Sequence, residues 1–218
     1  MLAALIFLPL VGALVTWLIR YDRLRPKVLS LFALGHLGIT IQLLTLTPAE
    51  SPGGWIHLDA LGKIVLLSTS VLFLFCAIYS IGYLFYRRER SNRVLCVGLL
   101  VCLSAASLVT ISHHLGLMWV ALETTTISMA PLIYFNRNAR SIEATWKYLL
   151  ICSVGVALAL IGLYFLAYAT VVAKVEPSLL LDDLMRDAGK LSSGWVHAAF
   201  VFLLVGFGSK MGLAPLHT

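Results

Sequence analysis

The chain has 218 residues, of which 60% are hydrophobic and only 12% charged, and its mean hydropathy is +0.95. Soluble domains contain about 25% charged residues, so this composition excludes an ordinary water-facing domain. The formal net charge of +6 does not indicate a nucleic-acid-binding protein. Its charges fall mostly in short loops between apolar runs, rather than in a basic stripe interleaved with aromatic residues.

Taken in chain order, the apolar runs are long enough to cross a lipid bilayer, which requires about 20 residues. Seven segments approach that length, at residues 2–19, 28–46, 64–86, 94–111, 115–135, 144–170 and 195–212. The predicted fold class is therefore an all-α, polytopic transmembrane helical bundle. The long loop 175–194 alternates leucines and charges with helical spacing, which is typical of a short helix on the membrane surface.

Basic residues alternate between the loops and predict the orientation of the chain. The loops after the first, third and fifth segments hold Arg20, Arg23, Arg25, Lys27, Arg87, Arg88, Arg90, Arg93, Arg137 and Arg140, whereas the other loops hold Lys63, Lys174, Arg186 and Lys190. Cytoplasmic loops carry the excess of lysine and arginine. We therefore expect a multi-pass protein of the inner (cytoplasmic) membrane, with its N-terminus outside and the arginine-rich loops in the cytoplasm.

Charged residues inside the apolar segments are the candidate functional residues, because each costs about 2.5–3.5 kcal/mol at the centre of a membrane helix. Glu123 lies near the middle of its segment, with Thr126 and Ala130 on the same side, so we expect it to face the bundle. Lys210 lies among glycines ahead of Pro215, where we expect the last helix to break and line a cavity. The alternatives are a purely structural hydrogen bond for the glutamate and an interfacial position for the lysine.

Three further residues have both an ionic and a structural interpretation. Lys147 follows Glu143 by four residues, a spacing that favours an ion pair on one helix face, and it is either a proton carrier or a topology anchor. His217 follows the predicted break at Pro215 and is the histidine whose position most favours an ionic role. His36, central in the second segment, fits an interhelical hydrogen bond better than a proton relay.

Three blocks of sequence together resemble the antiporter-like subunits shared by respiratory complex I, multi-subunit cation/proton antiporters and membrane-bound hydrogenases. They read MWVALETTTISMAPLIYF, SIEATWKYLLICSVGVALALIG and VGFGSKMGLAPLHT. The first two are most similar to component F of hydrogenase-4. The resemblance assigns Glu123 to the glutamate of the family's fifth helix, Lys210 to the lysine of its broken seventh helix, and Lys147 to a basic residue on the sixth.

The resemblance also implies a division of the chain. Residues 1–93 correspond to the first three helices and residues 94–218 to the start of the antiporter-like repeat. Family members continue into a second half of the bundle with further charged residues, so we expect this chain to be the N-terminal half only. It is either a natural split subunit, a truncation or a fragment.

The function implied is that of a membrane subunit of a redox-driven proton pump, which moves protons through a Glu123–Lys210 pair. Such a subunit has no active site of its own. None of the four cysteines forms a C-x-x-C pattern, so nickel–iron, iron–sulfur or quinone groups are expected only in partner subunits. The implied partners are other membrane subunits, including a chain that supplies the missing helices, a peripheral hydrogenase or dehydrogenase arm, and the lipid bilayer.

Two other functions stay open at this point. The first is a cation/proton antiporter subunit without a redox partner. The second is an inactive subunit with an assembly or scaffold role.

Overall fold

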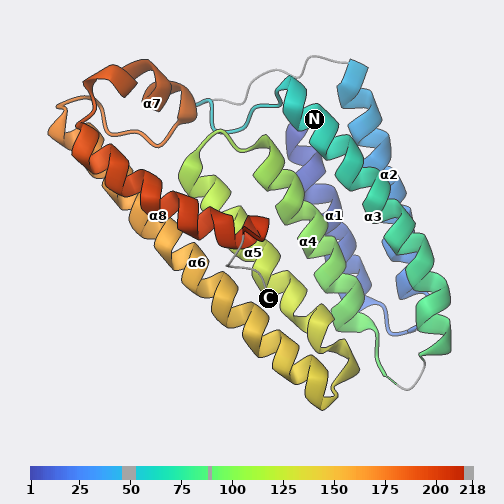
Figure 1. The fold of residues 1–218 in the computed structure, drawn as a ribbon. Coiled ribbons are helices and arrows are strands. Elements are labelled where there is room, and N and C mark those ends of the chain that lie inside the picture. The colour runs from blue at the N-terminus through green and yellow to red at the C-terminus, as the bar shows by residue number, and fades with distance from the viewer. Residues whose placement is uncertain (46–52, 88–89, 214–218) are drawn as a thin grey trace.

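The computed structural model describes residues 1–45, 53–87 and 90–213 (Figure 1). Over these ranges the chain is a bundle of helices, and its only β-structure consists of isolated bridges. The elements are α1 (Leu2–Leu18), α2 (Arg25–Thr45), α3 (Ala60–Tyr86), α4 (Arg93–Ile111), α5 (Leu115–Ile133), η1 (Tyr134–Asn136), α6 (Ala139–Val172), α7 (Leu181–Asp187), η2 (Ala188–Lys190) and α8 (Ser193–Met211). The predicted all-α polytopic bundle is confirmed.

Six of the described helices are long and apolar enough to cross a membrane, namely α2, α3, α4, α5 with η1, α6 and α8. The helix α1 is apolar but has 17 residues, at the short end of the range that spans a bilayer. All seven predicted segments therefore correspond to apolar helices. The remaining α-helix, α7, lies in the loop where the sequence predicts a short surface helix. It covers Leu181–Asp187 only, a shorter stretch than the loop 175–194 allowed.

The helix α6 extends well beyond the apolar run that predicted it. It has 34 residues and begins at Ala139, because Asn138 and Ser141 form a capping box. The Asn138 side chain accepts a hydrogen bond from the Ser141 amide at 2.7 Å, and the Ser141 hydroxyl accepts one from the Asn138 amide at 3.0 Å. At 1.5 Å per residue the helix is about 51 Å long, more than the ~30 Å hydrocarbon thickness of a bilayer.

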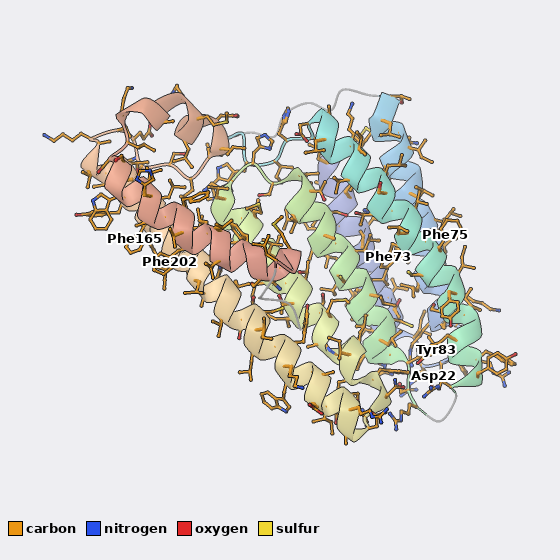
Figure 2. The ribbon with its side chains drawn as sticks, in the orientation of Figure 1. Asp22, Phe73, Phe75, Tyr83, Phe165 and Phe202 are labelled. Atoms are coloured by element: carbon orange, nitrogen blue, oxygen red, sulfur yellow. The ribbon has the colours of Figure 1, made fainter. Side chains whose placement is uncertain are left out.

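The helices α1 to α5 pack side by side, while α6 and α8 run together obliquely along one side of the bundle (Figure 1). The close approach of α6 and α8 depends on small residues. A Cβ at Gly206 would lie 2.5 Å from the backbone nitrogen of Ala159 and 2.7 Å from the Gly155 carbonyl oxygen. Towards the other end of the contact, Phe165 and Phe202 meet with their ring centroids 5.4 Å apart (Figure 2). Glycine at this contact lets the two backbones approach closely.

A polar network crosses the first half of the bundle. His36 of α2 is fully buried; its Nε2 lies 2.9 Å from the Ser107 hydroxyl of α4, and its Nδ1 lies 3.0 Å from the Ser70 hydroxyl of α3. The Ser70 hydroxyl also contacts the Thr40 hydroxyl at 3.0 Å. These four residues form the His36 network. Both ring nitrogens have partners, so the expected interhelical hydrogen bond is confirmed.

Arg25 is a second buried polar residue, at the arginine-rich end of the bundle. Its side chain is paired with Asp22 and donates hydrogen bonds to the Ile19 carbonyl at 2.8 and 3.0 Å and to the Asn92 side chain at 3.1 Å. It therefore fastens the α1–α2 turn to the start of α4. The sequence counted Arg25 only as a loop charge, and its structural role follows from this packing.

On the opposite end of the bundle, α7 and η2 carry their own charge pairs. Lys190 donates a hydrogen bond to Asp187 at 2.7 Å, and Arg186 lies within 3.4 Å of the same carboxylate. These contacts, with the Lys190 hydrogen bond as the largest cause, lower the pKa of Asp187 from its ordinary value. Leu184 is the buried apolar residue of α7, whereas Met185 is exposed.

Candidate functional site

Glu123 occupies the middle of α5, with eight residues of the helix before it and ten after it. Its Oε2 atom is buried and has no hydrogen-bond partner among the described residues. A buried carboxylate oxygen without a partner costs about 1–3 kcal/mol or more. Such an atom is rarely retained for packing alone, and it has the capacity to take up a proton.

Lys210 approaches the same face of α5 from the end of α8. Its ammonium group donates a hydrogen bond to the Thr126 hydroxyl, which in turn donates to the Leu122 carbonyl at 3.1 Å. Thr126 follows Glu123 by three residues, so both belong to neighbouring positions on one helix surface. No carboxylate among the described residues lies within 4.0 Å of the Lys210 ammonium. The lysine therefore lies near the glutamate's helix face but is hydrogen-bonded to the threonine instead.

Tyr148 of α6 completes this group. Its ring centroid lies 6.0 Å from the Lys210 ammonium nitrogen, within the range of a cation–π contact. Glu123, Thr126, Tyr148 and Lys210 are named the Glu123 cluster below. It brings together side chains from α5, α6 and α8.

The Glu123 cluster lies at mid-depth in the bundle. Gly155, which is within one residue of the midpoint of α6, packs against Ser209. Lys210 is the next residue, so it reaches the bundle halfway along α6. Figure 1 shows the same arrangement, with α8 ending about midway along α6 rather than at its far end. Lys210 therefore lies level with the middle of α6 and not with either of its ends.

The described residues include the end of the last helix but not Pro215, where the sequence predicts its break. α8 is continuous through Lys210 and ends at Met211, and Gly212 follows in the left-handed conformation with φ +68°. The chain thus leaves the helix directly after the lysine, as a C-terminal glycine cap allows. Pro215 and His217 lie outside the described residues, so the ionic role expected of His217 stays a prediction.

Lys147 points to a different surface. It makes the predicted ion pair with Glu143 at 2.6 Å, but the two side chains are 61% and 63% exposed. The structure therefore does not bring Lys147 together with Glu123 and Lys210. Its neighbour Tyr148, which the sequence analysis did not single out, is the α6 residue that faces the cluster.

The cluster contains a carboxylic acid, an amine, a phenol and an alcohol, all groups that can donate or accept protons. Among the residues that the structure describes, no group of three or more histidine, cysteine, aspartate or glutamate side chains gathers as a metal site would require. The side chains of the cluster thus have the chemical groups that proton transfer requires.

A bundle of membrane-crossing helices with a glutamate and a lysine at mid-depth defines a polytopic membrane protein with an ionisable interior site. Residues 112–218 match the family described as NADH:quinone oxidoreductase/Mrp antiporter, transmembrane. The chain belongs to this family of antiporter-like membrane subunits, as the sequence resemblance predicted.

Individual relatives agree with this assignment. The chain is 30% identical to a hydrogenase-4 component F homolog of Methylacidiphilum infernorum, over 99% of this chain and 46% of the relative. Its fold matches a chain of the archaeal membrane-bound sulfane sulfur reductase, with TM-score 0.84 and 19% identity over 99% of this chain and 45% of that one. It also matches a chain of respiratory complex I from Thermus thermophilus, with TM-score 0.79 and 21% identity. This match covers 100% of this chain and 45% of that one. The chain spans less than half the length of each.

Proposed function

We propose that the protein is a membrane subunit of a redox-driven proton pump of the hydrogenase-4 or complex I type, and that Glu123 and Lys210 carry the proton. One observation carries this proposal: a glutamate in the middle of a membrane helix has a buried oxygen without a partner, on the helix that also contacts the lysine. The similarity to a hydrogenase-4 component F homolog supports the choice of complex. Nickel–iron, iron–sulfur or quinone groups belong to partner subunits in this proposal.

In this proposal we take the described arrangement as the separated state of the pair. Lys210 is hydrogen-bonded to Thr126, and Glu123 lacks a cation within ion-pair distance among the described residues. An ammonium without a carboxylate partner in a low-dielectric interior gives up its proton more readily than a paired one. Transfer of one proton from the Lys210 nitrogen to a Glu123 oxygen neutralises both groups, and only one N–H bond and one O–H bond change.

In this proposal Tyr148 assists the transfer. Its ring lies beside the Lys210 ammonium, with the ring centroid 6.0 Å from the nitrogen. A phenol can accept one proton while it donates its own, and this supports Tyr148 as a relay between the lysine and the glutamate. Charge movement in neighbouring subunits then favours either the paired or the separated state, and the alternation moves the proton onward.

The test is to replace Glu123→Gln and Lys210→Met separately in the assembled complex. Everted membrane vesicles, energised by the complex's own redox substrates, report proton uptake. We expect translocation to fall by at least about a hundredfold, the range of a lost acid–base group, while the amount of assembled complex on a native gel is unchanged. Undiminished pumping in both variants overturns the proposal.

Matched controls are available in the loop before α7. Lys174 and Glu176 are exposed, so Glu176→Gln and Lys174→Met make the same chemical changes away from the Glu123 cluster. These variants are expected to pump at the wild-type rate. A loss of assembly in the cluster variants alone, with normal pumping per complex, would instead favour a scaffold role.

A second candidate function follows from the family description, which includes Mrp antiporters. In that case the same Glu123 and Lys210 exchange protons for another cation without a redox partner. Proton movement that needs a sodium gradient, and proceeds without any electron donor or acceptor, would identify this function.

A further inference from the structure

The arginine-rich end of the bundle contains a cavity of about 390 Å³ where α2 begins and α3 ends. Figure 2 shows Asp22 and Tyr83 close to this end of the bundle. The cavity walls are of two kinds. The basic ones are Arg23, Lys27, Arg87 and Arg90, and the apolar ones are Pro26, Ile81, Leu84 and Phe85.

Among the described residues, none pairs a carboxylate within 4.0 Å with any of the four basic groups of the cavity. Asp22 also lines the cavity, but its carboxylate is paired with Arg25. Two of the arginines are held by neutral oxygens: Arg87 donates to the Asn136 side chain at 3.0 Å, and Arg90 donates to the Phe135 carbonyl at 2.8 Å. These hydrogen bonds position both guanidinium groups without placing a negative charge beside them.

The apolar wall continues onto the outer surface of α3. Ile81 and Phe85 are one helical turn apart, and they are 37% and 58% exposed. In a membrane this surface faces the hydrocarbon region, while the basic residues lie at the helix ends and therefore at the headgroup level. The cavity thus has a cationic part at the interface and an apolar part that leads into the membrane.

We propose that this cavity binds an anionic phospholipid, with its phosphate against Arg23, Lys27, Arg87 and Arg90 and an acyl chain along Ile81 and Phe85. Arginine binds phosphate oxygens with paired, charge-assisted hydrogen bonds. Basic pockets between membrane helices on the cytoplasmic side are suited to such headgroups. Four cations without a carboxylate partner in the described part of the chain favour a headgroup with two phosphates over a zwitterionic one, whose own amine would be repelled.

The bound lipid explains the local arrangement of charge. In the predicted topology these loops face the cytoplasm, and the positive-inside pattern alone requires only that basic residues be present there. It does not require four of them to converge on one cavity with an apolar wall. The site is separate from the Glu123 cluster, so its test is independent of the proton-pumping proposal.

The experiment uses the assembled complex, purified in mild detergent, and measures retained lipid by native mass spectrometry. The variant Arg23→Gln/Lys27→Gln removes two cavity charges that have no hydrogen bond within the protein among the described residues. We expect it to bind cardiolipin roughly tenfold more weakly or worse, given the contribution of each basic residue near a membrane surface. Arg23→Lys/Lys27→Arg keeps both charges and is expected to retain the lipid.

The matched control is Arg137→Gln/Arg140→Gln, which removes two exposed charges from the same end of the bundle outside the cavity. Equal loss of cardiolipin in both double variants shows a general surface effect and overturns the proposal. Equal retention of phosphatidylcholine and cardiolipin overturns it as well.

Two other occupants of the cavity would be recognised by different results. If inorganic phosphate stabilises the delipidated complex as strongly as cardiolipin does, the cavity is a free-anion site instead. If the intact complex retains no lipid and a loop of a partner subunit cross-links to Lys27, the cavity is a protein contact and the proposal is overturned.

Discussion

The His36 network and the Glu123 cluster are both polar groups at mid-length of apolar helices, but they differ in how far their hydrogen bonds are satisfied. Both ring nitrogens of His36 contact hydroxyls, at 2.9 and 3.0 Å, and the residue is fully buried. Glu123 has a buried oxygen with no partner among the described residues. A satisfied polar network holds helices together, whereas an unsatisfied ionisable group inside a membrane helix is a candidate functional group.

The largest stability effect is expected from the satisfied network. His36→Ala removes two interhelical hydrogen bonds and leaves a cavity where α2, α3 and α4 meet, so we expect a loss of about 2–4 kcal/mol. The melting temperature of the solubilised complex measures it. Proton translocation per assembled complex should be unchanged.

His197 provides the control for that substitution, because it is exposed on α8, and His197→Ala is expected to leave the melting temperature where it was. If His36→Ala instead abolished pumping in a complex of normal stability, the contrast between the His36 network and the Glu123 cluster would fail. The histidine would then belong to a proton path.

The next effect concerns the packing that delivers Lys210 to the cluster. Gly206→Ala places a Cβ 2.5 Å from the Ala159 backbone nitrogen, so α8 must move away from α6. We expect a loss of about 1–3 kcal/mol, the usual cost of overpacking, together with slower proton translocation, because Lys210 is displaced from Thr126. Melting temperature and vesicle pumping assays, measured on the same preparation, report the two effects.

Gly82→Ala is the matched control, because a Cβ at Gly82 meets nothing within 4 Å. It is expected to be neutral or slightly stabilising, since alanine favours the helix by about 1 kcal/mol relative to glycine. A Gly206→Ala variant that melts and pumps like Gly82→Ala would show that the position of Lys210 does not depend on this contact.

The sequence predicts the helices well because lipid imposes a simple requirement on length and polarity. It also identifies Glu123 and Lys210, because a charge in an apolar run is visible without any structure. Thr126 is identifiable from the sequence only as a small residue on the same side of the helix as Glu123, and Tyr148 is not identifiable as a member of the site at all. Their roles depend on where α8 crosses α5 and α6. Arg25 is likewise predicted only as a cytoplasmic loop charge. Its burial arises from contacts with Asn92, which is distant in the sequence.

The smallest effect is expected from Lys147, where the family resemblance and the structure give different answers. The resemblance matches it to a basic residue on the family's sixth helix, which makes it a candidate proton carrier, but the structure places it in an exposed pair with Glu143. Solvent screens an exposed ion pair so strongly that it adds little to stability. We therefore expect Lys147→Gln, Glu143→Gln and the double variant to melt at the wild-type temperature and to pump at close to the wild-type rate. Loss of pumping as complete as in Glu123→Gln would return Lys147 to the path, and it would mean that a partner subunit or a conformational change covers a side chain that this state leaves exposed.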